Sequence, residues 1–428
     1  MTDILDDLEW RGLIAHSTDL DALRKAIADG QVTVYCGFDP TAASLHAGNL
    51  VQILTLRRLQ QAGLRPIGLV GGATGLIGDP KPTAERALND RDVVAGWVER
   101  IRAQIEPFLT FDSGAPNDAV MVNNLDWTAP MSAIDLLRDI GKHFRVNRMI
   151  AKDAVSRRLN SDQGISYTEF SYQVLQGMDF LELYRRYGCT MQTGGSDQWG
   201  NLTAGVDLIH RAEGASVHAL ATSLVTKADG TKFGKTEGGA TWLDPELTSP
   251  YAFYQFWFNA DDRDIVGFLK LFSFRSREEI EELARLTAER PAARAAQRAL
   301  AEELTTLVHG ADECEKVIAA SKALFGQGDL ASLDEPTLGA ALAEVPSTRV
   351  TAGAGEALPS LVDLFTAAEL TPSKSAARRT VNEGGAYLNN AKVTDPDAVP
   401  GEADLLHGRY LVLRRGKRTA GGVEVLRG

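Results

Sequence analysis

The sequence predicts an α/β fold in which a parallel sheet carries helices on both faces and is followed by a helical segment and a small α+β unit. Through the first half of the chain, short apolar runs alternate with stretches of helical periodicity, which is typical of a parallel sheet. The runs lie at 32–37, 66–72, 119–122, 188–193 and 217–222. Ligands of such sheets bind beyond the carboxyl ends of the strands, so the residues after each run are the first candidates for a site.

Changes in pattern divide the chain into segments. The sheet domain is expected to span 1–226, with a helical insertion at about 124–187 that includes helices at 133–140 and 168–186. A Gly-containing loop at 227–244 follows. A helical domain over 245–330 is predicted by amphipathic helices at 277–284, 292–308 and 313–325. Residues 331–356 are rich in Gly, Ala, Pro and Thr and are expected to be a linker, which leaves 357–428 as the α+β unit.

The length and composition are those of a multidomain globular protein. A chain of 428 residues is too long for one typical core, so we expect two or three domains. Hydrophobic residues make up 44% and charged residues 24%, as in an ordinary soluble protein. The formal net charge of −12 argues against a nucleic-acid partner only as a whole-chain sum, because such binding depends on local basic patches.

Export and membrane insertion are not indicated. We find no apolar run long enough to span a bilayer, and the N-terminal segment 1–9 is acidic, unlike a signal or transit peptide. The cysteines, Cys36, Cys189 and Cys314, lack metal-type spacing and are odd in number, so we expect reduced thiols. A cytoplasmic protein is therefore expected.

The segment 39–49 reads DPTAASLHAGN and lies where the first run passes into a helical stretch. Such a junction points backbone N–H groups and the positive end of the helix dipole at an anion, and Gly48 lets the anion approach the backbone closely. His46 and Asn49 lie at this junction as well. Taken alone, such a segment is usually an ordinary capped turn.

A second segment, Lys232-Phe233-Gly234-Lys235-Thr236, places two lysines three residues apart in a loop bracketed by glycines. Such a loop is expected to move and to be able to close over phosphates. By itself a Lys-x-x-Lys loop is usually a solvated surface. The order of the two segments, and the residues between them, favour a joint role at a triphosphate.

Together the two segments resemble the HIGH and KMSKS signatures of class I aminoacyl-tRNA synthetases, and the surrounding stretches resemble bacterial tyrosyl-tRNA synthetases along nearly the whole chain. Asn49 departs from the final His of HIGH, and Phe233 and Gly234 depart from Met and Ser of KMSKS. Because an Asn amide can donate to a phosphate oxygen, we expect its role to be retained. The resemblance implies a Rossmann-like catalytic domain and a homodimer formed mainly by the helical insertion.

Within the insertion, Tyr172, Gln176 and Asp179 are spaced to project from one helix face. Polar residues on one face often mark only the solvated side, but apolar neighbours around this helix favour a partly buried wall. The resemblance implies that Tyr172 and Gln176 hold the α-ammonium of tyrosine and that Asp179 takes its phenol hydroxyl. It adds four residues to the tyrosine site: Tyr35 at the phenol, Asp79 at the ammonium, Asn124 and Gln198.

The segment 194–201, GGSDQWGN, follows the fourth run and is by itself a plausible plain turn. By resemblance, Asp197 binds the ribose hydroxyls of ATP, Gly195 permits close approach, and Gln198 reaches the carboxyl end of the substrate. The residues expected to bind ATP are Gly37, Asp39, Thr41, His46, Gly48, Asn49, Gly195, Asp197 and Lys235.

The implied reaction has two steps: the tyrosine carboxylate attacks the α-phosphate of ATP, and the 3′-terminal ribose of tRNA(Tyr) then takes the tyrosyl group. No side-chain nucleophile is needed, so catalysis is positioning and stabilisation of charge. The groups expected to act on the phosphates are Thr41, His46, Asn49, Arg86, Lys232 and Lys235. The loop before Arg86 is shorter than in several relatives, which leaves the roles of Lys81 and Arg86 open. Magnesium is expected to arrive with ATP, without a metal site made by the protein alone.

Basic residues cluster near the end of an otherwise acidic chain. Helical spacing brings Lys374, Arg378 and Arg379 together, a Gly-Gly turn leads into a short strand, and Arg414 and Arg415 follow. The stretch is similar to the S4 RNA-binding motif, and its clustered charge would neutralise RNA phosphates. The alternative is a solvated basic surface.

Two other classes of function stay open on the sequence alone. A nucleotidylyltransferase could share the His46 segment and use another acceptor, although the polar row and the basic tail argue against it. A non-catalytic RNA-binding protein derived from a synthetase is the other, although Lys232, Lys235, Asp79 and Asp179 are all present. Tyrosine-dependent exchange of pyrophosphate into ATP separates the three.

Overall fold

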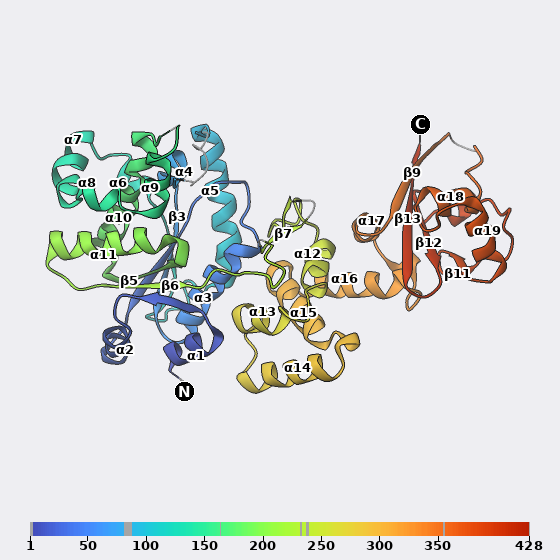
Figure 1. Ribbon diagram of the computed structural model, residues 1–428, viewed down its shortest axis with the longest axis horizontal. Helices are drawn as coiled ribbons and strands as arrows, with labels where there is room; N and C mark the ends of the chain where they lie inside the picture. Colours follow the sequence, from blue (N-terminus) through green and yellow to red (C-terminus); the bar gives the residue numbers. More distant parts are fainter. Residues whose placement is uncertain are drawn as a thin grey trace. The chain divides into compact units, whose positions relative to one another are not determined.

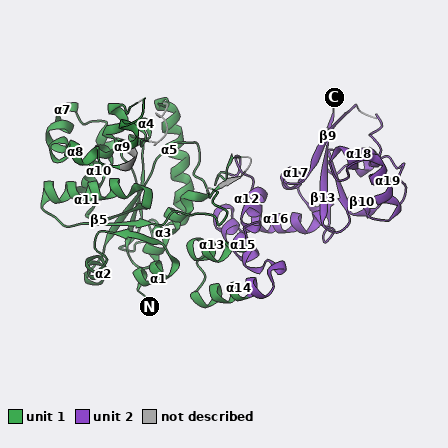
Figure 2. Ribbon diagram, viewed as in Figure 1, with its two compact units in different colours: residues 1–244, 262–285 green, residues 245–261, 286–428 purple. Residues whose placement is uncertain are grey.

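The computed structural model describes residues 3–80, 88–162, 164–231, 233–236, 239–353 and 356–427. The chain divides into two compact units, 1–244 with 262–285 and 245–261 with 286–428 (Figure 2). The segment predicted as one helical domain, 245–330, is therefore shared between the units. Its α13 (Ile265–Phe272) belongs to the first unit, where Arg11 and Arg58 donate hydrogen bonds to the carbonyl of Ser273 directly after it.

The first unit is built on a six-stranded sheet of order β1-β6-β5-β2-β3-β4. The strands are β1 (Ile14–Ser17), β2 (Thr33–Phe38), β3 (Arg65–Val70), β4 (Val120–Asn123), β5 (Cys189–Gly195) and β6 (His218–Thr222). Strands β2 to β6 pair in parallel, which confirms the parallel sheet and all five predicted runs. The four-residue β1, antiparallel to β6, was too short to be predicted.

Helices cover both faces of this sheet, as predicted: α10 and α11 lie to one side, and α3 and α5 to the other (Figure 1). The helices before and between the strands are α1 (Ile4–Arg11), α2 (Leu20–Asp29), α3 (Leu50–Gln61), α4 (Thr74–Ile77) and α5 (Arg91–Ile105). The insertion and the last crossover contain α6 (Leu125–Thr128), α7 (Ala133–Asp135), α8 (Val146–Met149), α9 (Asp153–Leu159), α10 (Tyr167–Tyr187) and α11 (Trp199–Glu213). The helix predicted at 133–140 is α7 followed by a π-helical turn, Leu136–Ile140.

Strand order reverses between β2 and β5. The chain leaves β2 for β3 on one side, and β5 later joins the other edge of β2. Connections that diverge in this way leave a crevice beyond the carboxyl ends of the two strands, where ligands of open α/β sheets bind. The segments 39–49 and 194–201 begin at these two ends.

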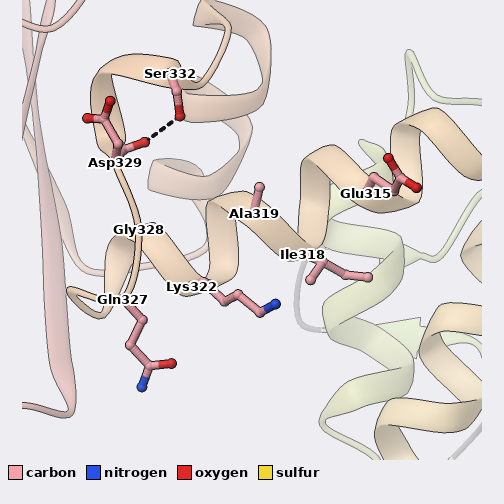
Figure 3. Close-up of a pocket in the computed structure, with 8 residues that line it drawn as sticks. All are labelled: Glu315, Ile318, Ala319, Lys322, Gln327, Gly328, Asp329 and Ser332. Carbon is pink, nitrogen blue, oxygen red and sulfur yellow. Dashed lines mark hydrogen bonds between the residues drawn. The ribbon is translucent and has the colours of Figure 1, made fainter.

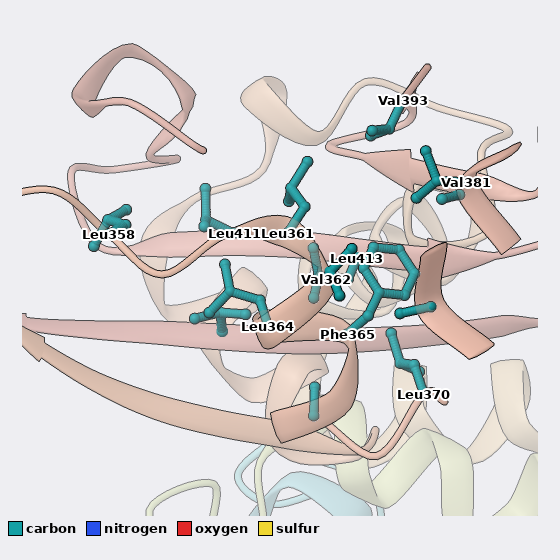
Figure 4. Close-up of a cluster of buried hydrophobic side chains, with 14 of the residues drawn as sticks. Leu358, Leu361, Val362, Leu364, Phe365, Leu370, Val381, Val393, Leu411 and Leu413 are labelled. Atoms are coloured by element: carbon teal, nitrogen blue, oxygen red, sulfur yellow. The ribbon is translucent and has the colours of Figure 1, made fainter. Parts of the chain in front are cut away.

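The second unit combines helices with a five-stranded sheet of order β11-β10-β12-β13-β9. Its helices are α12 (Pro250–Phe258), α15 (Ala295–His309), α16 (Ala311–Leu324), α17 (Glu335–Ala343), α18 (Leu361–Ala367) and α19 (Lys374–Asn382), while α14 (Arg277–Glu289) spans the unit boundary. Its strands are β9 (Ser347–Ala352), β10 (Ala386–Leu388), β11 (Ala391–Lys392), β12 (Tyr410–Arg415) and β13 (Thr419–Arg427). Buried side chains of α18, among them Leu364 and Phe365, pack with Leu411 and Leu413 of β12 (Figure 4).

The prediction of a linker at 331–356 is wrong. This segment forms α17 and β9, and β9 pairs in parallel with β13 over six residues, from Ser347 opposite Gly422 to Ala352 opposite Arg427. A Cβ at Gly422 would lie 3.1 Å from the Cβ of Leu342, so α17 packs closely on the same strand. Its Gly, Pro and Thr content resembled a linker, but the pairing partner of β9 lies far along the chain.

The position of β9 predicts how truncated chains behave. A chain ending at Glu356 retains β9 without β13, whereas one ending at Pro346 lacks both. An unpaired strand edge promotes association, so we expect the longer chain to aggregate more and to melt at a lower temperature. Light scattering and thermal melts of the two chains test this, and equal behaviour of the two would contradict it.

Candidate active site

The segment after β2 forms a short capped turn before α3. The turn, Ala47–Asn49, is closed by the Gly48 N–H, which donates to Nδ1 of His46 at 3.1 Å, and by the His46 N–H, which donates to Oδ1 of Asn49 at 3.0 Å. With the Asn49 carbonyl oxygen used in the cap, its NH2 group is the part that can donate to an anion. Thr41 is exposed nearby in the chain. The predicted strand-to-helix junction is confirmed.

The lysine loop lies directly against this turn. The Ala47 N–H donates to the carbonyl of Thr241 at 2.8 Å, and the Thr241 N–H donates to the carbonyl of Gly234 at 3.0 Å. A Cβ at Gly234 would lie 3.4 Å from the backbone nitrogen of Gly48. The two segments that the sequence grouped by order are therefore neighbours in space.

Two departures from the lysine-loop signature have structural reasons. Gly234 has φ +75°, in the left-handed region that favours glycine over serine. Phe233 is buried and lies 5.1 Å from the ring of Phe268 and 5.4 Å from that of Phe272, both in α13. The phenylalanine therefore anchors the loop to this helix.

Several basic residues of the prediction cannot be placed. Lys81, Arg86 and Lys232 lie outside the described residues, and for Lys235 the structure describes the backbone, in β7 (Lys235–Thr236), which pairs with β8 (Gly239–Ala240). Their roles stay predictions.

The polar row on α10 lies in a buried cluster of polar side chains, which we call the pocket residues. Asp179 is 2% exposed and accepts hydrogen bonds from Nδ2 of Asn124 and from Nε1 of Trp127, each at 2.9 Å. The Tyr35 hydroxyl and Oε1 of Gln176 are buried and have no hydrogen-bond partner among the described residues. Buried polar atoms normally have partners, so these two atoms indicate a polar ligand.

Hydrogen bonds connect this cluster to Asp39 through Thr74 and Tyr172. The Tyr172 hydroxyl donates to Oδ2 of Asp39 at 2.7 Å, and Oγ1 of Thr74 donates to Oδ1 of Asp39 at 2.6 Å. Nδ2 of Asn124 donates to Oγ1 of Thr74 at 2.9 Å. Sequence reasoning missed Thr74 and Trp127. Their positions just after β3 and β4 were the signal that could have found them.

Burial shifts the pKa values of the pocket. It raises the pKa of Asp179 to about 7, although the hydrogen bonds from Asn124 and Trp127 favour the ionised form. Burial and the nearby carboxylates raise the pKa values of the Tyr35 and Tyr172 phenols well above the usual range, so both remain protonated donors at neutral pH.

A second polar group surrounds Asp79. Nε2 of Gln198 donates to Oδ2 of Asp79 at 3.0 Å, and Nδ2 of Asn201 donates to Oδ1 at 3.3 Å. Nζ of Lys152 donates to Oδ1 of Asn201 at 3.0 Å, and burial lowers the pKa of this lysine to about 7 against the opposing effect of Asp79. Sequence reasoning did not select Lys152 or Asn201.

The turn after β5 presents its acidic side chain to solvent. Asp197 is exposed, and a Cβ at Gly195 would lie 2.5 Å from its Oδ1. A side chain at position 195 would displace this carboxylate. The contact with Asp197 therefore favours glycine at position 195. Gly37, at the end of β2, is also exposed.

The basic residues of the second unit differ in their surroundings. Nζ of Lys374 lies 2.5 Å from Asp363, and the Arg378 guanidinium lies 2.6 Å from Asp397. Arg379 and Arg415 are exposed.

Arg414 requires a correction, because it is only 7% exposed. It donates to the carbonyl of Gly416 at 2.7 Å, and its guanidinium carbon lies 4.0 Å from the centroid of the Tyr387 ring. The prediction that Arg414 contacts RNA is not supported, because charge pattern alone does not report burial.

A separate surface hollow lies at the end of α16 (Figure 3). Its lining contains none of the residues predicted for tyrosine, ATP or RNA; it is made by Glu315, Ile318, Ala319, Lys322, Gln327, Gly328, Asp329 and Ser332. In the described part of the chain, none of the helices has the length and apolar character needed to cross a bilayer.

The raised pKa of Asp179 predicts a pH-dependent stability. The folded chain binds this proton more tightly than the unfolded chain, whose Asp pKa is about 3.9, so stability falls as the pH rises from about 4 to about 7. Asp179→Asn removes the titration, and we expect its melting temperature relative to wild type to rise between pH 5 and pH 8. Thermal melts across that range measure this difference. The exposed Asp126→Asn is the control and should follow wild type; a pH-independent difference for Asp179→Asn would contradict the argument.

Comparison with known proteins agrees with this geometry. A model of the class I tRNA synthetases (W and Y) matches residues 28–326, and a model of the tyrosine–tRNA ligase SYY-like C-terminal domain matches residues 338–420. The tyrosine–tRNA ligase of Streptomyces avermitilis is 73% identical over 429 residues, covering 100% of both chains. That of Thermobifida fusca is 67% identical over 431 residues, covering 99% of both.

Solved structures give the same family. A C-terminally truncated mitochondrial tyrosyl-tRNA synthetase from Coccidioides posadasii is 32% identical with a TM-score of 0.65, covering 74% of this chain and 91% of that one. A tryptophanyl-tRNA synthetase from Encephalitozoon cuniculi, bound to tryptophan, is 15% identical with a TM-score of 0.53, covering 73% and 87%; it shares the fold alone. With a family model over most of its length and relatives matched from end to end, the chain belongs to the tyrosine–tRNA ligases, within the class I tRNA synthetases of the W and Y group.

Proposed function

We propose that the chain activates L-tyrosine with ATP to give tyrosyl-adenylate and pyrophosphate, and then transfers the tyrosyl group to the 3′ end of tRNA(Tyr). The observation that carries the choice of amino acid is the pair formed by the buried Asp179 carboxylate and the Tyr35 hydroxyl, which has no hydrogen-bond partner among the residues that the structure describes. A phenol hydroxyl can donate to the first and accept from the second. An amino acid without that hydroxyl would leave the Tyr35 hydroxyl unpaired and would offer Asp179 no donor beyond Asn124 and Trp127, which costs binding energy.

At the other end of the substrate, Asp79, Tyr172 and Gln176 bind the α-ammonium group. The Tyr172 hydroxyl donates to Asp39, so its oxygen is oriented to accept from the ammonium. Oε1 of Gln176, for which the described part of the chain supplies no hydrogen-bond partner, is a second neutral acceptor. Gln198 reaches the substrate carboxyl group, and Asn124 acts by holding Asp179.

The phosphates of ATP lie at the turn before α3. His46, Asn49 and Thr41 donate to the phosphates, and Gly48 admits them close to the backbone. Lys232, Lys235 and Arg86 neutralise the departing pyrophosphate. The nucleoside lies beyond β2 and β5, where Gly37, Asp39 and Gly195 line its path and Asp197 accepts from the ribose hydroxyls. Magnesium is carried on the ATP phosphates, and we assign it no protein ligand.

Pyrophosphate exchange distinguishes ligase activity from the two competing functions. A nucleotidylyltransferase with another acceptor, or a non-catalytic RNA-binding protein, would not exchange pyrophosphate into ATP in response to tyrosine. Tyrosine-dependent exchange by the purified full-length chain supports the proposal, and exchange that is absent or independent of tyrosine contradicts it.

The second unit and the insertion suggest the macromolecular contacts. Lys374, Arg378, Arg379 and Arg415 form a basic surface of S4-like character that would neutralise tRNA phosphates. Exposed apolar side chains gather in the insertion, which is where a homodimer would form: Leu125, Ile134, Leu137 and Val146. Three buried, unpaired thiols are compatible with the reducing cytoplasm, where we place the protein.

Tyr35→Phe tests the phenol site without disturbing the fold. The variant removes a buried hydroxyl that has no hydrogen-bond partner among the described residues, so the melting temperature should stay the same or rise. The KM for tyrosine in pyrophosphate exchange should rise about threefold to tenfold, as expected for one lost neutral hydrogen bond, while the KM for ATP stays constant. Selectivity for tyrosine over phenylalanine should fall in parallel. An unchanged selectivity would sink the phenol assignment.

Arg379→Gln with Arg415→Gln tests the RNA surface in the full-length chain. Removing two exposed cations should weaken tRNA binding and lower the slope of log K against log salt concentration by about one per lost phosphate contact. Pyrophosphate exchange should be unaffected, while tRNA charging slows at limiting tRNA. The matched control is Lys25→Gln, an exposed cation of α2. A salt slope equal to that of wild type would rule out these two arginines as phosphate contacts.

A further inference from the structure

Lys152 approaches the Asp79 site from the helical insertion. It directly precedes α9, and its Nζ donates to Oδ1 of Asn201 in α11 at 3.0 Å. Its stem crosses the start of α11, because a Cβ at Gly200 would lie 3.1 Å from Cε and 3.2 Å from Nζ of the lysine. Lys152 is half-buried, so its Nζ gives up part of its contact with water and hydrogen-bonds to one specific acceptor, Oδ1 of Asn201.

Asn201 connects this lysine to the carboxylate. Its Nδ2 donates to Oδ1 of Asp79 at 3.3 Å and to Oε1 of Gln198 at 2.8 Å, while Gln198 donates to the other oxygen of Asp79 at 3.0 Å. The two ends of an amide side chain have similar shapes but opposite hydrogen-bonding roles. In its protonated form the lysine only donates, so it then fixes the amide oxygen of Asn201 toward itself and the NH2 group toward Asp79.

We propose that Lys152 is a positioning residue of the ammonium site, which acts through Asn201 to hold the Asp79 carboxylate and Gln198 in the orientation that receives the α-ammonium group of tyrosine. This inference rests on the proposed role of Asp79. Without Lys152, Asn201 can turn its amide oxygen toward Asp79, where two acceptors would face each other. The carboxylate would then move or lose a donor, and the ammonium group would meet a less ordered site.

The backbone that carries Lys152 is held in place by a buried ion pair. Arg158 in α9 and Glu169 in α10 are each 2% exposed, and Nη2 of the arginine lies 2.9 Å from Oε2 of the glutamate. Nε of Arg158 also donates to the carbonyl of Gly164 at 3.0 Å. Because α10 also carries Tyr172 and Gln176, the lysine and two of the proposed ammonium-binding residues are positioned by the same packing.

The test compares two ligands that differ only in the ammonium group. Calorimetry measures the binding of tyrosine and of 3-(4-hydroxyphenyl)propanoate to the full-length wild type and to Lys152→Met, which keeps the apolar stem over Gly200. We expect tyrosine to bind about tenfold more weakly to the variant, the size of a lost coupling within one hydrogen-bond network. The affinity for the analogue without an ammonium should stay nearly unchanged. Lys142→Met, at an exposed lysine of the same insertion, is the matched control and should behave as wild type.

A double-mutant cycle tests the route through Asn201. Asn201→Ala should weaken tyrosine binding, and adding Lys152→Met to it should have no further effect. Equal losses for both ligands, or an unchanged ratio of their affinities, would overturn the positioning role. Wild type that does not prefer tyrosine to the analogue would instead overturn the proposed role of Asp79, and this inference with it.

Discussion

The reversal of strand order between β2 and β5 is the constraint on which the rest of the site depends. It opens the sheet at one place. Four segments of the candidate site directly follow strands of this sheet: 39–49 after β2, 71–79 after β3, Asn124 after β4 and 195–198 after β5. Helix α10 lines this crevice with its polar row. Backbone hydrogen bonds from Ala47 to Thr241 then fix the lysine loop against the turn before α3. Four segments that follow strands, helix α10 and the lysine loop therefore come together at one crevice.

Local physics explains the departures from the family signatures without loss of the site. Gly234 adopts a backbone conformation that suits glycine, and a Cβ at this position would lie at van der Waals distance from the backbone of Gly48. Phe233 packs on two rings of α13, and Arg11 and Arg58 hold the backbone just after that helix. Asn49 uses its oxygen in the cap and keeps its NH2 group for an anion. Each departure changes how the turn or the loop is held, and under the proposed assignment the groups offered to the phosphates are retained.

Much of the catalytic half could be predicted because strands buried on both faces give continuous apolar runs that stand out in a sequence. Strand β9 was missed because its exposed and half-buried residues alternate and its partner β13 lies far along the chain, so no local signal separates it from a loop. Arg414 was misjudged because a basic residue in a basic stretch gives no sign that it stacks on Tyr387. The row Tyr172, Gln176 and Asp179 was found from its spacing. Trp127 and Asn201 were missed because they hydrogen-bond to Asp179 and Asp79, which only the fold brings near them.

The polar groups of the pocket differ in the hydrogen-bond partners that the folded chain gives them, and this difference bears on the selectivity for the amino acid. Asp179 has two donors and is nevertheless destabilised by burial, while the hydroxyl of Tyr35 has no partner among the described residues. A buried polar group left without a partner costs about 1–3 kcal/mol, and a bound ligand that excludes water without pairing with Tyr35 imposes that cost. A ligand hydroxyl that donates to Asp179 and accepts from Tyr35 avoids the cost, whereas a ligand without a hydroxyl excludes water and leaves Tyr35 unpaired. Under the proposed assignment, the preference for tyrosine therefore arises because a correctly placed ligand hydroxyl replaces the hydrogen-bond partner that Tyr35 loses when the ligand excludes water.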